Sequence, residues 1–389
     1  MRHGLNAALW PLLTALASCA RHALATPVPA VAFATDTVRT EKLRDGVTRW
    51  FVYAPSGPWA IHALVVDRDE CYSALAVKEP DGAVGREKTS VILERLRASA
   101  EVVGGVNADF FLFTPPGVPT NLLVSHGRVV TGPSNQPVLA FDSTGAPHIT
   151  TFRVEGSVST TGGRFAIAGW NRSAPSGISL FDDGWGGSTD SASKIVEVAV
   201  DRSGAGQVVA IDTLTTGVPM PPGHVVLAGR GSDARAALLA LRVGDSVHTQ
   251  VALLPFHPKE ALGGRPILVR DSTIVTGLDS AGGAAFAAAR HPRTAVGIAR
   301  NGRRLLLVVV DGRQTGYSDG MTLRELADVM RALGARDAIN LDGGGSTTLV
   351  YAEPRNEARL RIANRPSDPA GERPVGDALA IVRGCASTR

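Results

Sequence analysis

The segment INLDGGGSTTLVY, residues 339–351, places a carboxylate and three consecutive glycines directly after an apolar run. Glycine loses more conformational entropy on folding than any other residue. Gly343, Gly344 and Gly345 are therefore expected to do something that a residue with a Cβ cannot. They either form a tight turn or let the backbone come close to a ligand.

Asp342 would lie beside the free N–H groups of these glycines, an arrangement that suits an anionic ligand. Ser346 and Thr347 follow and add two hydroxyl donors. The alternative is a strand-to-turn junction at which Asp342 makes only an Asx turn. The residues by themselves leave both interpretations open.

Two other apolar runs end in acidic residues. Asp311 follows the run RRLLLVVV, and Arg313 comes two residues later. Asn107 and Asp109 end the run EVVGGV and, because alternate residues of an extended chain share a face, they point to the same side. A solvated loop is the alternative at Asp311, and a polar strand end without a ligand is the alternative at Asn107 and Asp109.

The segment RHPRTAVGI places two guanidinium groups and an imidazole before a predicted strand. Arg290 and Arg293 could hold a phosphate between them. His291 could carry protons at physiological pH. The alternative is a surface loop stiffened by Pro292.

The elements around Asp311 and Asp342 predict how these two residues are positioned. The buried run RRLLLVVVDG, the amphipathic pattern MTLRELADVMRALGA and the buried run DAINLDGGGS follow one another. This order predicts a parallel strand pair joined by a right-handed helical crossover. Both carboxylates would then lie at one sheet edge, about 5 to 10 Å apart.

Further patterns predict the remaining elements. Thr322 and Glu325 form a capping box for the crossover helix. The segment EKTSVILERLRASA is a second helix, which Thr89 or Ser90 could cap. VTRWFVYAP and WAIHALVVD alternate as strands, and PTNLLVSHGRVV and RPILVRDSTIVT are typical of hairpins.

The predicted fold class is α+β, with a mixed β-sheet core, flanking helices and a β-rich insertion. Residues 26–100 are expected to form a β-rich segment packed on a main domain of residues 101–383. Within that domain, residues 151–255 are rich in Gly, Ser and Thr and are predicted to form the insertion.

Residues 1–25 have the charge and apolar length of an export signal. Cleavage after Ala25 would give a secreted or periplasmic protein, whereas the lipobox-like LASC would lead to a lipid anchor at Cys19. That anchor is the only membrane attachment expected. An oxidising compartment would permit a disulfide between Cys71 and Cys385.

The 389 residues are 44% hydrophobic and 20% charged, which favours a globular chain with a sizeable core. The net charge of +4 is mild. No basic run is dense enough to indicate a nucleic-acid partner.

Taken together, the motifs NADFF, RHPRTAVGI, VVVDGRQTGYSDGMTLRELADVM, AINLDGGGSTTLV and RPVGDALAIV resemble the phosphodiester glycosidase family, in this order along the chain. The resemblance covers roughly residues 100–383. It implies an enzyme that cleaves the bond between a sugar anomeric carbon and a phosphodiester oxygen. The substrate would be a glycosyl phosphodiester or a phosphorylated polysaccharide. A cell-envelope or exopolysaccharide substrate suits the apparent export signal.

Residue roles in such a reaction follow from its chemistry. A sugar carbon with oxocarbenium character needs a nearby carboxylate as nucleophile or base, and the candidates are Asp342, Asp311 and Asp109. Arg293 and the N–H groups of Gly343, Gly344 and Gly345 would stabilise the leaving phosphate. The other expected substrate-binding or supporting residues are Asn107, Thr294, Arg313, Asn340, Ser346 and Thr347.

Two alternatives to cofactor-independent hydrolysis stay open. The same pocket could bind a glycan or polyanion without catalysis. It could also hold a divalent cation between Asp311 and Asp342, because oxygen ligands leave no sharp spacing pattern in a sequence. No cofactor is otherwise implied.

Overall fold

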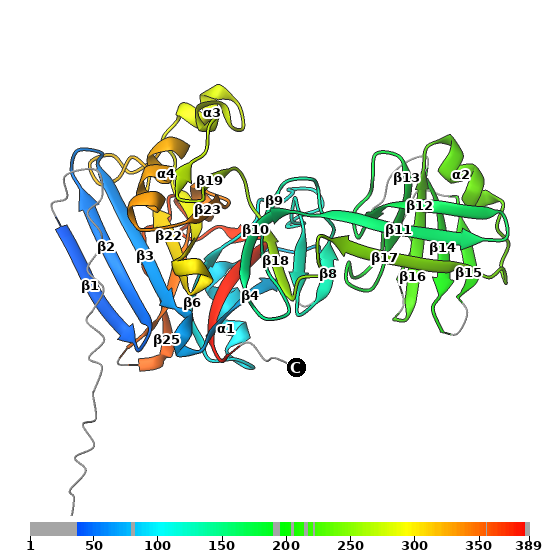
Figure 1. Ribbon diagram of the computed structural model, residues 1–389, viewed down its shortest axis with the longest axis horizontal. Helices are drawn as coiled ribbons and strands as arrows, with labels where there is room; N and C mark the ends of the chain where they lie inside the picture. The colour runs from blue at the N-terminus through cyan, green and yellow to red at the C-terminus, as the bar shows by residue number, and fades with distance from the viewer. Residues whose placement is uncertain are drawn as a thin grey trace, which may run out of the picture.

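The computed structural model describes residues 37–78, 82–189, 195–203, 206–213, 217–220, 222–354 and 356–385 (Figure 1). The proposed export signal, with Cys19 and Ala25, lies outside these residues. Within the described part of the chain, no helix has the length and apolar character needed to cross a membrane.

The largest sheet contains eight strands, and every neighbouring pair in it is antiparallel. Its long apolar strands, such as RLLLVVV, are buried on both faces because other layers cover both sides of the sheet. In spatial order its strands are β1 (Thr37–Arg44), β2 (Val47–Ala54), β3 (Trp59–Asp67), β22 (Arg304–Val310), β21 (Arg293–Ala299), β23 (Asp337–Asn340), β19 (Ile267–Arg270) and β20 (Thr273–Ile274).

A second, five-stranded antiparallel sheet packs face to face with the first. Leu64, Val296 and Leu307 of the first sheet share a buried core with Val106 and Leu379 of the second. In spatial order the strands of the second sheet are β25 (Asn356–Ile362), β24 (Leu349–Glu353), β6 (Val102–Asn107), β27 (Asp377–Arg383) and β4 (Tyr72–Lys78).

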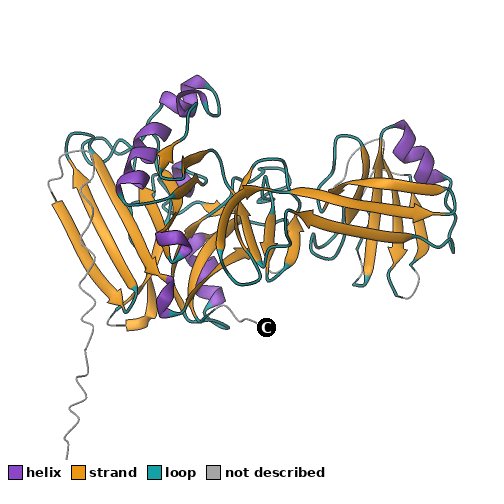
Figure 2. Cartoon of the chain, in the orientation of Figure 1, coloured by secondary structure: helices purple, strands orange, loops and turns teal. Residues whose placement is uncertain are grey.

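One helix covers the outer face of each sheet, so the main body has four layers in the order helix, sheet, sheet, helix (Figure 2). Helix α4 (Leu323–Ala332) packs Leu326 and Met330 onto the eight-stranded sheet. Helix α1 (Thr89–Leu96) packs Ile92 and Leu93 onto the five-stranded sheet. These layers bring the ends of β21, β22, β23 and β6 into one region.

The remaining elements are smaller. Helix α3 (Ala284–Ala288) lies near the end of α4. Strands β5 (Glu87–Lys88) and β26 (Pro374–Val375) form a short pair. A further antiparallel sheet consists, in spatial order, of β10 (Pro147–Thr151), β9 (Pro137–Phe141), β18 (Glu260–Gly263), β7 (Leu123–Ser125) and β8 (Arg128–Thr131).

Residues 153–254 form a separate seven-stranded sheet with its own apolar core, and Figure 1 shows it projecting from one end of the main body. Helix α2 (Ser232–Leu239) packs on it. In spatial order its strands are β15 (Gln207–Asp212), β14 (Ile195–Asp201), β16 (His224–Arg230), β13 (Gly177–Phe181), β12 (Gly163–Trp170), β11 (Arg153–Thr160) and β17 (His248–Leu254).

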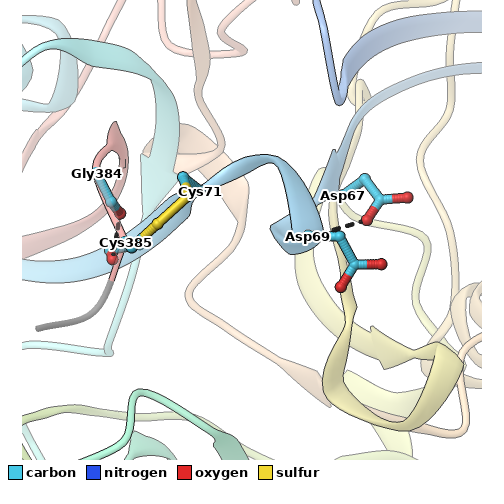
Figure 3. The surroundings of a disulfide bond; sticks show 6 residues. Asp67, Asp69, Cys71, Gly384 and Cys385 are labelled. Carbon is cyan, nitrogen blue, oxygen red and sulfur yellow. Dashed lines mark hydrogen bonds between the residues drawn. A yellow bond between two sulfur atoms is a disulfide. The ribbon is translucent and has the colours of Figure 1, made fainter. Parts of the chain in front are cut away.

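A disulfide joins Cys71, just before β4, to Cys385, just after β27 (Figure 3). It closes a loop of 314 residues between two strands that already pair with each other. The bridge that the cysteine count allowed is therefore present, and it fixes the C-terminal strand to the five-stranded sheet.

The predicted α+β class is confirmed only in part. Strands make up 48% of the chain and helices 13%. The protein is β-rich, and the expectation of a mixed core sheet is wrong. The one parallel strand pair in the described residues joins β12 and β13, in the sheet of residues 153–254.

The predicted strand–helix–strand unit is present with one correction. The strands β22 and β23 run parallel, but β21 lies between them and pairs antiparallel with both. Asp311 and Asp342 consequently lie at the same edge of the sheet and are separated by two strand spacings, about 10 Å. The capping box of Thr322 and Glu325 is confirmed.

The predicted cap of helix α1 is wrong. Lys88 occupies the N-cap position, and its side chain makes no capping hydrogen bond. The Glu372 carboxylate caps the helix instead. It accepts hydrogen bonds from the backbone N–H and the hydroxyl of Ser90 at 2.7 and 2.6 Å. A partner so distant in the sequence could not be read from the local pattern.

Candidate active site

A cavity of about 280 Å³ lies where β21, β23 and the glycine segment meet. It contains three guanidinium groups, one carboxylate and one imidazole, so positive groups outnumber negative ones. The residues that line it are Phe110, Phe286, His291, Pro292, Arg293, Arg313, Asn340, Leu341, Asp342, Gly343, Gly344 and Arg373.

The three glycines are needed because the backbone here is crowded. A Cβ at Gly343 would lie 2.6 Å from the Pro292 carbonyl oxygen. Gly344 has a φ of +63°, in the left-handed region, and a Cβ there would lie 3.2 Å from the Arg313 guanidinium. A Cβ at Gly345 would collide with the ion pair between Asp368 and Arg373. Close packing therefore explains the run of glycines.

The Asp342 carboxylate lies in a largely buried position on the wall of the cavity. Burial raises its pKa to about 6, although a hydrogen bond of 2.9 Å from the Gly343 N–H opposes that effect. The Ser346 hydroxyl lies close enough to lower this pKa but makes no hydrogen bond of normal geometry. Asp342 is therefore mostly ionised at neutral pH and close to its titration range.

Arg293 is 2% exposed, yet it forms no ion pair with any residue that the structure describes. Its guanidinium donates to the backbone carbonyls of Met321 and Ala289 at 2.8 and 3.2 Å and lies 4.9 Å from the Phe286 ring centroid. Burial, and then the nearby Arg313, lower its pKa to about 10, so it stays charged at neutral pH. A buried cation without a counter-ion is costly, and an anionic ligand would remove that cost.

Arg313 supplies a second cation to the cavity, and it too lacks an ion-pair partner within the described ranges. Its guanidinium donates to Nδ1 of His291 at 3.1 Å. Burial, followed by Arg293 and Arg313, lowers the pKa of His291, which favours the neutral imidazole. Neutral His291 can accept this hydrogen bond and hold Arg313 toward the cavity. The third guanidinium, that of Arg373, is paired with Asp368 at 2.8 Å.

A cluster of carboxylates lies behind the cavity. Asp109 and Asp377 are 1% and 0% exposed, and Asp377 accepts a hydrogen bond of 2.9 Å from the Asp109 N–H. Burial raises the pKa of Asp109 to about 7. Burial raises the pKa of Asp377 as well, and the negative charges of Asp109 and Asp342 add to this effect. One Asp377 oxygen has no hydrogen-bonding partner in the described structure.

Asp109 was predicted as a third catalytic candidate, but it does not line the cavity. Its oxygens accept from the Asn121 N–H at 2.9 Å and the Thr120 hydroxyl at 3.4 Å. Arg172 and Arg265 lower its pKa from a distance. Asp109 consequently supports the wall of the site from behind.

Asn107 and Thr294 were predicted to orient sugar hydroxyls or to support the residues that do, and Thr347 was predicted to bind substrate. The structure places all three beneath the glycine segment. Asn107 donates to the Asp342 carbonyl at 2.7 Å and accepts from the Thr294 hydroxyl at 2.8 Å. The Thr294 hydroxyl also lies 3.4 Å from that of Thr347. All three residues are at most 1% exposed, so they hold the segment in place and do not reach the cavity. Ser346 is also fully buried.

Asn340 is the predicted amide that does line the cavity. Its Nδ2 donates to the Arg265 carbonyl at 2.6 Å, whereas its Oδ1 is buried without a hydrogen-bonding partner among the described residues. A buried unpaired carbonyl oxygen is unfavourable and is available to accept from a ligand hydroxyl.

Asp311 was predicted as a catalytic partner of Asp342, and the structure does not bring it to the cavity. It is 0% exposed, and both of its oxygens are occupied. Oδ1 accepts from the Asn364 amide at 3.1 Å and the Arg365 N–H at 2.9 Å. Oδ2 contacts Nε2 of His62 at 3.1 Å and accepts from the Tyr317 hydroxyl at 3.2 Å. Asp311 therefore joins distant segments and has no free oxygen for a substrate.

The backbone of the glycine segment also differs from expectation. The Gly343 N–H donates to Asp342, and the Gly344 N–H donates to the Pro292 carbonyl at 2.9 Å. These two groups are therefore not free to bind a phosphate, and Gly345 does not line the cavity. The positive charge around the cavity comes from side chains.

A metal site is not evident in the part of the chain that the structure describes. No group of three or more His, Cys, Asp or Glu side chains there is arranged to hold a cation. In particular, the predicted pair Asp311 and Asp342 does not converge on one point, because only Asp342 faces the cavity.

Sequence reasoning missed Phe110, Phe286 and Arg373 on the cavity wall and Asp377 behind it. Arg373 and Asp377 are the first and fifth residues of the motif RPVGDALAIV. The placement of Asp377 depends on β27 pairing with β6, a contact between segments about 270 residues apart.

Comparison with solved structures shows what the fold resembles. A hypothetical protein from Synechocystis superposes with a TM-score of 0.74 at 24% identity, covering 89% of this chain and 64% of that protein. The chain thus spans less than two thirds of that relative. A presumed exported protein from Burkholderia pseudomallei K96243 gives a TM-score of 0.71 at 21% identity, covering 92% and 98%.

The catalytic domain of zebrafish N-acetylglucosamine-1-phosphodiester alpha-N-acetylglucosaminidase gives a TM-score of 0.44 at 17% identity, covering 92% of this chain and 84% of that domain. That similarity is too low to carry an argument. No protein of curated function matches the chain.

A sequence model of the phosphodiester glycosidase family matches residues 194–382. This range contains Arg293, Arg313, Asp342 and Arg373, whereas the motif NADFF lies before it. The resemblance that the motifs indicated is therefore confirmed over nearly half of the chain, and residues 194–382 are phosphodiester glycosidase-like.

Proposed function

We propose that the protein is a phosphodiester glycosidase that hydrolyses the bond between a sugar anomeric carbon and a phosphodiester oxygen. One observation carries this proposal: Arg293 and Arg313 lie without ion-pair partners in the described structure, in the same cavity as Asp342. Two unpaired cations suit a phosphate, and a single carboxylate suits the sugar carbon beside it.

The proposed reaction breaks the C1–O bond, and the phosphate monoester leaves with the bonding electrons. This leaving group is already anionic, so stabilising its charge matters more than protonating it. Arg293 and Arg313 supply that stabilisation. Asp342 opposes the positive charge that develops at C1 and takes the proton of the attacking water. The Asn340 carbonyl oxygen accepts a hydrogen bond from a sugar hydroxyl.

The substrate is proposed to be a cell-envelope or exopolysaccharide phosphodiester outside the cytoplasm. The disulfide between Cys71 and Cys385 supports an oxidising compartment. The export-like residues 1–25 and the presumed export of the Burkholderia relative support the same location.

The direct test incubates the purified protein with a panel of sugar-1-phosphate diesters and detects free sugar by mass spectrometry. Release of sugar together with a phosphate monoester is the expected result, and EDTA treatment should leave the rate unchanged. Binding of these diesters without any sugar release would support the non-catalytic alternative and contradict the proposal.

A further inference from the structure

The sheet of residues 153–254 is almost closed into a barrel. Its first strand in spatial order, β15, contacts the residues that lead into its last strand, β17. Gln207 forms a β-bridge with Ser246, and the Val208 N–H donates to the Asp245 carbonyl at 2.9 Å. The Val247 N–H donates to the Gly206 carbonyl at 2.9 Å. Because barrel mouths commonly bind ligands, the openings of this unit are candidate sites.

A cavity of about 340 Å³ opens between β17, β13 and the end of β14. Its polar lining consists of a carboxylate, a guanidinium, an amide and a hydroxyl, from Asp182, Arg202, Gln250 and Thr249. Its aromatic residue is Trp170. None of these residues lines the cavity that contains Asp342.

One side of this second cavity is rigid before any ligand binds. The indole N–H of Trp170 donates to Oδ2 of Asp182 at 2.8 Å. Oδ1 of Asp182 accepts from the Asn171 amide at 2.7 Å and from the Gly184 N–H at 2.9 Å. These bonds fix the plane of the indole ring, so little conformational entropy is lost when a ligand packs on it.

The opposite side carries hydrogen-bonding capacity that the protein does not use. The side chains of Arg202, Thr249 and Gln250 make no hydrogen bond or ion pair with any residue in the described ranges. Together they offer several N–H donors, a hydroxyl, and an amide oxygen as acceptor. This combination of an apolar ring and unpaired planar polar groups matches a sugar ring, which has apolar C–H faces and a rim of hydroxyls.

We propose that the unit of residues 153–254 contains a second, non-catalytic site that binds one saccharide unit, between Trp170 on one side and Arg202 and Gln250 on the other. The inference goes beyond hydrolysis and does not depend on it. The chain continues directly from Trp170 to Arg172, which donates to the backbone carbonyls of Pro119 and Asn121 in the main body, both at 3.0 Å. The site is thus anchored to the body that holds Asp342.

The test uses the full chain on an array of defined bacterial-type oligosaccharides, followed by calorimetric titration of the best binder. We expect the double variant Arg202→Ala, Gln250→Ala to weaken saccharide binding at least ~10-fold. The control variant Arg164→Ala, at an exposed position of β12 outside the cavity, should bind like the wild type. Both positions changed in the double variant are exposed, so folding should be unaffected.

Two further measurements separate this site from the proposed active site. The double variant should hydrolyse a small sugar-1-phosphate diester at the wild-type rate, and Asp342→Asn should keep its binding on the array. Saccharide binding that survives in the double variant, or that is lost with Asp342→Asn, would overturn the second site. Complete absence of binding on the array would also overturn it. If binding is present but no diester is cleaved, the second site stands and the proposed function fails.

Discussion

Asp311 and Asp342 occupy equivalent places in the sheet and have opposite surroundings. Both follow buried strands that run parallel on either side of β21. Four groups contact the oxygens of Asp311, whereas Asp342 has one hydrogen bond of normal geometry and faces a cationic cavity. The comparison shows that a strand-end position does not define a catalytic carboxylate. The partners supplied by distant segments decide its role.

The largest expected effect distinguishes the two aspartates by activity. Asp342→Asn keeps the shape of the side chain but removes its charge, so hydrolysis of a sugar-1-phosphate diester should fall by ~10³-fold. Initial rates with the purified variant measure this, and circular dichroism checks that the fold is intact. Wild-type activity in this variant would contradict the role of Asp342.

The cationic side of the cavity should contribute the next largest effect. Arg313→Ala removes an exposed guanidinium without an ion-pair partner, and kcat/KM for phosphodiesters should drop by ~10²-fold. Hydrolysis of an uncharged aryl glycoside should change far less. Arg324→Ala, on the exposed side of α4, is the matched control. Equal losses on both substrates would rule out a phosphate-binding role for Arg313.

For Asp311 the main effect should be on stability. Asp311→Ala leaves His62, Tyr317 and Asn364 without a shared partner, and the free energy of unfolding should decrease by about 2 kcal/mol. Urea denaturation measures the change. In this variant Asn364 still donates to the Thr347 carbonyl and so still holds the residues that follow the glycines. Activity per folded molecule should therefore fall by less than ~10-fold. A loss of activity as large as that of Asp342→Asn, in a fully folded sample, would show that Asp311 takes part in the reaction.

The smallest expected effect is the dependence of activity on pH. Asp342 must be ionised to act, and its pKa is about 6. The value of kcat/KM should therefore rise with pH up to about 6 and level off above it, with a ~10-fold loss for each unit below. The Asp311→Ala variant should keep this profile. An acid limb that moves in that variant would contradict the assignment of the profile to Asp342 alone.

Local patterns predicted the local features of the fold. The capping box at Thr322, the apolar run of β22 and the turn-rich hairpins each depend on residues close in the sequence. The placement of β21 between β22 and β23 does not depend on residues close in the sequence. Nothing in the sequences of these strands specifies which strand lies beside them in the sheet. The sequence therefore predicted two aspartates at one edge but could not predict antiparallel pairing throughout the core sheets.

The same limit applies to the candidate site. Asp342, Arg293, Arg313 and Asn340 were identified because their residue types suit an anionic sugar, and the cavity brings them together. Asn107 and Thr294 have suitable types as well, but their polar atoms are used within the protein. Only the three-dimensional partners distinguish a residue that binds substrate from one that supports the loop beneath it.

A crystal structure with a non-hydrolysable sugar-1-phosphonate ester would test the central claim most directly. The account predicts the phosphonate between Arg293 and Arg313, with the anomeric carbon next to the Asp342 carboxylate and a sugar hydroxyl near Asn340. A phosphonate bound elsewhere, with the Asp342 cavity empty, would contradict the assignment of this cavity as the active site.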